Sequence, residues 1–152
     1  MKKISIVAMS VFIMGMMVGS VNAASLGYID YQKVFSSYEK TKKAEDQINK
    51  KTQILQDEVT KKQKQIEKEK ENGMSNDDLK SLVTKIQKEL EPKQQEIINL
   101  KQKLEGEIRD DIVKATSDLS KKEGLEAIVD KKAVITGGVD ITDKVIEQLK
   151  KK

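Results

Sequence analysis

The side chains that most often perform chemistry are absent from this chain or occur in patterns typical of exposed helices. The 152 residues include no Cys and no His, which excludes thiolate nucleophiles, imidazole bases, disulfides and His/Cys zinc sites. Asp140 and Asp143, separated by Ile141 and Thr142, resemble a divalent-cation loop. Because Asp140 precedes an apolar-periodic segment, the same residues also fit the start of a helix. We predict that Asp140 caps the last helix, and that the protein uses no metal or cofactor and is not an enzyme.

A second group of charged side chains is a basic cluster near the middle of the chain. It lies in residues 61–70, where two Glu accompany five Lys, namely Lys61, Lys62, Lys64, Lys68 and Lys70. Such a cluster attracts anionic lipid headgroups or lipopolysaccharide, and it equally fits a solvated helix face. The net charge of the whole chain is only +4, so composition gives no support for a nucleic-acid partner.

The first residues have the pattern of a secretory signal peptide. Lys2 and Lys3 precede an apolar run from Ile4 to Val18, and small residues stand before a cleavage site after Ala23. The apolar run is short for a membrane-spanning helix, which needs about 20 residues. We predict that residues 1–23 are removed and that the rest is exported. Removal of the two lysines lowers the net charge from +4 to +2.

The exported part divides into a small body and a long insertion. Its aromatic residues are confined to one stretch between Tyr28 and Tyr38, so the compact core should lie there. The segment 26–31 and the apolar runs 125–129 and 133–135 are short enough for strands, and Gly137-Gly138 should form a hairpin turn. We expect an α+β, mostly helical fold: residues 24–38 and 123–152 form a β body with a terminal helix, and residues 39–122 form a helical hairpin.

The insertion has the spacing of an antiparallel coiled-coil hairpin. Its apolar residues recur at steps of three, four or seven, and Asn72-Gly73 interrupts the pattern near 72–76. Ser75 with Asp78 predicts a capped restart of the second helix. Pro92 removes one backbone hydrogen bond, but the period resumes in phase beyond it, so we expect a kinked, continuous helix rather than two helices.

Folding the chain back at 73–75 brings apolar residues of the two halves opposite one another. These residues, called the seam, contact either the partner helix or a bound client; they are Ile48, Leu55, Val59, Ile66, Val83, Leu90, Ile97 and Leu100. Because aliphatic residues on a helical period are usually structural, contact with the partner helix is favoured. The seam is interrupted by Lys62, Lys93 and Gln94, so we expect the far end of the hairpin to be flexible.

The two ends of the chain resemble the OmpH/Skp family of periplasmic chaperones. The resemblance rests on Gly27-Tyr28-Ile29-Asp30 with Lys33-Val34-Phe35, on 127–130, and on Asp140-Ile141-Thr142-Asp143. It implies a homotrimer with a β body made by all subunits and helical arms around a cavity, where unfolded outer-membrane proteins are held. Three short strands are too few to cover their own edges. Assembly should therefore pair these edges and join residues of several chains in one oligomerisation core. Its expected members are Tyr28, Ile29, Phe35, Ile128, Val129, Val134 and Ile135.

These observations favour an ATP-independent holdase that binds unfolded outer-membrane β-barrel proteins and prevents their aggregation. A structural coiled-coil protein of the cell envelope is the alternative, and it leaves the terminal strands unexplained. A lipid-binding amphipathic protein would need a wider apolar face than the seam offers.

Overall fold

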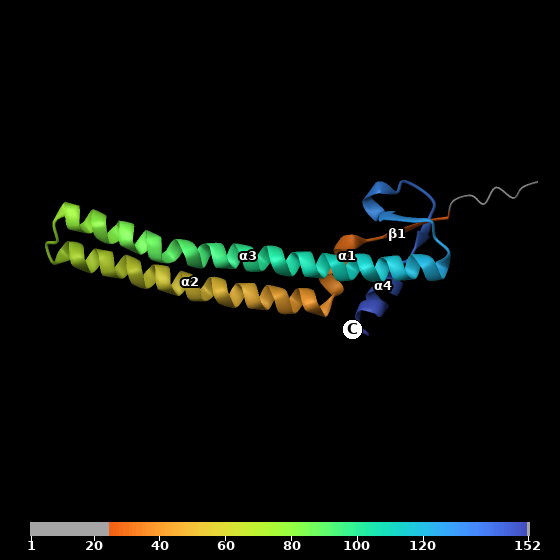
Figure 1. The fold of residues 1–152 in the computed structure, drawn as a ribbon, viewed down its shortest axis with the longest axis horizontal. Helices are drawn as coiled ribbons and strands as arrows, with labels where there is room; N and C mark the ends of the chain where they lie inside the picture. Colours follow the sequence, from red (N-terminus) through yellow and green to blue (C-terminus); the bar gives the residue numbers. More distant parts are fainter. Residues whose placement is uncertain (1–24, 152) are drawn as a thin grey trace, which may run out of the picture.

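The protein consists of two long helices that project from a small body of short strands and short helices (Figure 1). The computed structural model describes residues 25–151, so the predicted signal peptide and cleavage site lie outside the described residues. The prediction of a mostly helical fold with a small sheet is confirmed. In chain order the elements are β1 (Leu26–Ile29), α1 (Tyr31–Ser37), α2 (Glu39–Glu71), α3 (Asn76–Glu123), β2 (Ala127–Asp130), a 3-10 turn (Lys131–Ala133), β3 (Val139–Asp140) and α4 (Thr142–Leu149).

Helices α2 and α3 run side by side in opposite directions and form what we call the arm (Figure 1). Ion pairs between them set the register: Lys40 meets Glu107 at 3.2 Å near the body, and Lys62 meets Glu89 at 2.6 Å farther out. The 33 residues of α2 span about 50 Å at 1.5 Å per residue. The arm therefore extends well beyond the body.

The connection between the two helices is short, and its conformation is set by a glycine and by the N-cap of α3. Gly73, with φ of +83°, takes a backbone conformation that side chains disfavour. Ser75 is the N-cap of α3, and its hydroxyl oxygen accepts a hydrogen bond from the Asp78 backbone N–H at 3.2 Å. The Ser75 hydroxyl donates in turn to the Asp78 carboxylate at 2.7 Å. The predicted capped restart of the helix is therefore confirmed.

Helix α3 continues through Pro92 without interruption. The prediction of one continuous helix is confirmed, and the helix reaches back into the body. Its last third supplies Ile108, Ile112, Ala115 and Leu119 to the buried core. The body therefore includes residues that the sequence analysis assigned to the hairpin, because one uninterrupted helix runs from the arm into the body.

The sheet differs from the expected arrangement. Its order is β2-β1-β3, and both outer strands run parallel to β1. The predicted hairpin at Gly137-Gly138 is wrong, since β2 and β3 are separated by β1 and the chain must cross over between them. The predicted strand at 133–135 is also wrong: a 3-10 turn ends at Ala133, and the third strand begins only at Val139.

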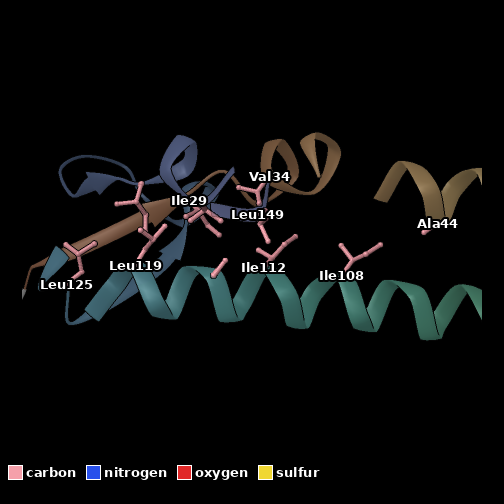
Figure 2. Close-up of a cluster of buried hydrophobic side chains, with 11 residues drawn as sticks. Ile29, Val34, Ala44, Ile108, Ile112, Leu119, Leu125 and Leu149 are labelled. Atoms are coloured by element: carbon pink, nitrogen blue, oxygen red, sulfur yellow. The ribbon is translucent and has the colours of Figure 1, made fainter. Parts of the chain in front are cut away.

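The core of the body lies between α3, the sheet, α1 and α4 (Figure 2). Ile108, Ile112 and Leu119 project from α3 toward Ile29 of β1 and Val34 of α1. Helix α4 closes the core with Val145 and Leu149, which are almost wholly buried. The aromatic stretch forms a helix rather than a continued strand, because Asp30 caps α1 by accepting from the Lys33 N–H at 2.9 Å.

Candidate interaction surfaces of the body and the arm

The body carries an apolar groove between α3 and strand β2. It has a volume of about 340 Å³, and its apolar wall includes Tyr31, Val113, Ile128 and Val129. Val113 leaves 58% of its surface exposed although it follows the fully buried Ile112. A groove of this kind is a surface that a further chain can cover.

Other apolar side chains of the body are open to solvent. Ile135, in the loop before β3, is fully exposed, and Val139 and Leu26 are 45% and 40% exposed. Within the described residues, β2 and β3 each pair on one side only, with β1. Free strand edges beside exposed apolar side chains are typical of a surface that associates with another chain.

The predicted oligomerisation core is divided by the structure into three groups. Ile29 is buried within the chain itself, and Ile135 is completely exposed. The rest are half-buried, namely Tyr28, Phe35, Ile128, Val129 and Val134. The sequence reasoning missed the residues that form most of the internal core, namely Val34, Ile108, Ile112, Ala115, Leu119, Ile141, Val145 and Leu149.

The seam residues occupy the interior of the arm and are only partly buried. This holds for Ile48, Leu55, Val59, Ile66, Val83, Leu90, Ile97 and Leu100. Ile86 is the most buried residue in the outer part of the arm, at 6% exposure. The two lysines that interrupt the seam make ion pairs across it: Lys62 with Glu89, and Lys93 with Glu58. Partial burial and ion pairing together hold a narrow two-helix contact.

These ion pairs change the titration of their carboxyl groups. The hydrogen bond from Lys62, with its charge, holds the pKa of Glu89 below the ordinary value, and Lys51 acts on the pKa of Glu96 in the same way. Lys51, Glu89 and Glu96 remain well exposed to solvent, and Lys62 is half-buried. The pairs therefore set the register of the helices more than they add to the free energy of unfolding.

A denser polar network ties the base of the arm to the body. The Tyr38 hydroxyl donates to the Asp111 carboxylate at 3.1 Å, and the Lys40 ammonium lies 3.0 Å from the same oxygen atom. Burial, followed by the bond to Asp111, raises the pKa of Tyr38. The bond to Asp111 is the main cause of the raised pKa of Lys40. Tyr38 has an extended backbone between α1 and α2, so this network fixes the point where the chain leaves the body.

The basic cluster on α2 is less uniform than its sequence implies. Lys62 is half-buried and paired with Glu89. The other four lysines are exposed, namely Lys61, Lys64, Lys68 and Lys70. Among residues 25–151, no helix is long and apolar enough to cross a membrane.

The acidic pair Asp140 and Asp143, at the start of α4, has a structural role in this chain. Asp140 accepts from the Thr142 backbone N–H at 2.9 Å and also from the Thr142 hydroxyl, which lowers the pKa of Asp140. The N-cap position itself belongs to Ile141, one residue later than predicted. Asp143 pairs with Lys33 at 2.7 Å, joining α4 to α1. No group of three or more potential metal ligands occurs in the described part of the chain.

Comparison with known proteins identifies the family. A family model described as outer membrane protein (OmpH-like) matches residues 25–149. The chain belongs to the OmpH-like family. This family consists of periplasmic chaperones that bind outer-membrane proteins, and it is not an enzyme family. The family resemblance predicted from both ends of the sequence is confirmed, while a search of curated proteins gives no match.

Proposed function

We propose that this OmpH-like protein is an ATP-independent periplasmic holdase, which keeps unfolded outer-membrane β-barrel proteins from aggregating. The family match over residues 25–149 carries the proposal. It is supported by an arm that stands clear of the body and leaves long helical surfaces open to a client (Figure 1). Many weak contacts along such surfaces hold a flexible chain without a single deep pocket.

The proposed assembly is a homotrimer joined through the body. The support is the apolar groove between α3 and β2, the exposed Ile135 and the free edges of the sheet. In this assembly the groove of one chain is covered by a second copy, and a third copy closes the ring. Three arms then surround a space in which the client is held.

Export and membrane contact complete the proposal. Cleavage after Ala23 delivers the chain to the periplasm, where unfolded outer-membrane proteins pass. The exposed lysines near the turn of each arm contact anionic lipid or lipopolysaccharide when the client is released. The seam holds the two helices of an arm together. The client contacts the solvent-exposed side chains of the arm that face the space between the three arms.

The experiment that tests this function is an aggregation assay. An unfolded β-barrel outer-membrane protein is diluted from denaturant, and light scattering is recorded with and without the chaperone. A holdase lowers the scattering at stoichiometric amounts with no nucleotide present. A structural coiled-coil protein of the envelope leaves the scattering unchanged, and that result would exclude the proposal.

A further inference from the structure

The two sides of the arm have different chemistry. The ion pairs between α2 and α3 involve six side chains in the outer arm, which we call the ion-pair face: Lys51, Glu58, Lys62, Glu89, Lys93 and Glu96. Near the body, Lys40 continues the series with Glu107 and Asp111. Ile54 lies beside these residues, because it lines shallow hollows with Lys51, Glu58 and Lys62.

The opposite side of the arm carries amide side chains, which we call the amide face: Gln56, Gln63, Gln87 and Gln94, with Ile98 as its apolar member. Gln63 follows Ile54 by nine residues, and Ile98 follows Glu89 by nine, which is about two and a half helical turns and places each pair on opposite sides of its helix. The four glutamine side chains are exposed, and their amide groups make no hydrogen bond within residues 25–151. Glu91 and Glu105 border this stretch.

The amide face is aligned with the groove of the body. Ile98 precedes Thr116 by 18 residues, or about five complete turns, so both side chains leave α3 on the same side. Thr116 lines the groove beside β2. In the trimer proposed above, this groove faces a neighbouring copy, so the amide face points toward the space between the arms.

We infer that the amide face binds the backbone of an extended, unfolded polypeptide. The inference deepens the proposed function and rests on it. An unfolded chain presents unpaired N–H and C=O groups, and a glutamine amide can donate to the one and accept from the other. The client's backbone is the same whatever its sequence, so such contacts suit a chaperone that holds more than one client.

The spacing of the glutamines fits this partner. Gln56 and Gln63 are seven residues apart, as are Gln87 and Gln94, which is about 10 Å along a helix. An extended chain advances about 3.3 Å per residue, so it meets an amide about every third residue. The exposed Ile98, at 48%, adds an apolar contact. Individual contacts are weak, and repetition along three arms makes binding effective.

The matched isoleucines provide the first test. Ile98→Ser removes the apolar member of the amide face, whereas Ile54→Ser removes an isoleucine of similar exposure from the ion-pair side. The dissociation constant for an unfolded, fluorescently labelled β-barrel outer-membrane protein is measured by anisotropy with the full-length mature chain. We expect Ile98→Ser to raise it about threefold to tenfold and Ile54→Ser to change it less than about twofold.

The matched glutamines provide the second test. Gln56→Ala with Gln63→Ala is compared with Gln47→Ala with Gln65→Ala, all four residues being exposed on α2. Alanine favours helix more than glutamine does, so neither variant should lose the arm, and circular dichroism and sedimentation check this. We expect only the first variant to weaken binding, by about threefold or more.

The outcomes separate the inference from the proposed function. A wild-type protein that neither binds the client nor suppresses its aggregation contradicts the proposed function itself. A wild-type protein that binds, combined with equal losses for Ile54→Ser and Ile98→Ser or for the two glutamine variants, overturns the amide face alone. Selective loss in both amide-face variants supports it.

Discussion

Val113→Asp should dissociate the oligomer while each chain stays folded. Val113 is 58% exposed and lines the groove beside β2, whereas the adjacent Ile112 is 1% exposed and belongs to the internal core. Substitution at Val113 therefore removes little from the chain's own packing. In the proposed trimer, the same substitution places a carboxylate in an apolar contact between copies.

The expected magnitude follows from the exposed fraction of Val113. Full burial of a valine is worth about 1.5–3 kcal/mol, so covering the 58% that is exposed would contribute about 1–2 kcal/mol at each interface. Three interfaces then lose about 3–5 kcal/mol, before the cost of burying the carboxylate is added. The association constant should fall by about a hundredfold or more.

Sedimentation over a range of concentrations measures the loss of assembly, and far-ultraviolet circular dichroism measures whether each chain remains folded. Ile112→Ala is the matched control: it should lower the free energy of unfolding of the body by about 2–5 kcal/mol, because a buried isoleucine is lost. If Val113→Asp keeps the wild-type mass at every concentration, the groove is not the surface through which the copies associate.

Three further outcomes follow from the arm and its ion pairs. Replacing residues 45–104 by a short turn should leave a folded, oligomeric body, since the core residues of α3 begin at Ile108, and should abolish client protection; an unfolded product would contradict this modularity. Lys62 lowers the pKa of Glu89. The ion pair between them therefore stabilises the arm fully above the ordinary glutamate pKa of about 4.3. This stabilisation is lost as pH falls through the lower pKa that Glu89 has in the folded protein. The protection factors of amides near the end of the arm, which correct for slower intrinsic exchange at low pH, should therefore fall below about pH 4, and Glu89→Gln should show the lower protection already at neutral pH. Substituting glutamine for the exposed lysines near the turn should abolish co-sedimentation with anionic vesicles at low salt without changing oligomer mass; wild-type protein that ignores these vesicles would leave the cluster as a solvated helix face. The lysines substituted are Lys61, Lys64, Lys68 and Lys70.

The long helices could be predicted from the sequence because their signals are local and repeated. An apolar period that resumes beyond Pro92 indicates that the helix continues, and Ser75 with Asp78 marks where it starts. The family could be predicted from the two ends of the chain, where short motifs occur in a fixed order.

The body could be predicted only in outline. Its strands are two to four residues long, which is too short for a period to show whether a segment is a strand or a turn, as the run 133–135 demonstrates. Parallel pairing of β1 with both outer strands is a long-range property that no local pattern reports. The helix over 31–37 was missed because its aromatic residues favour strands, whereas the Asp30 cap and burial of Val34 favour a helix.

The faces of the arm could not be predicted from either helix alone, because they depend on how α2 and α3 lie against each other. The seam follows from spacing within each helix, but Ile54 and Ile98 lie outside it, and only the ion pairs between α2 and α3 show that these two residues belong to opposite faces. The same geometry shows that Lys62 bridges the helices, unlike the exposed lysines of residues 61–70.

The most direct test of the account is the mass of the complex formed with an unfolded client. Sedimentation velocity of the mature protein, alone and with an unfolded β-barrel outer-membrane protein diluted from denaturant, gives the composition of each species. The account predicts a trimer that becomes a discrete soluble complex of one client with three chaperone chains, formed without nucleotide. A protein that stays at its own mass while the client aggregates beside it would contradict the central claim.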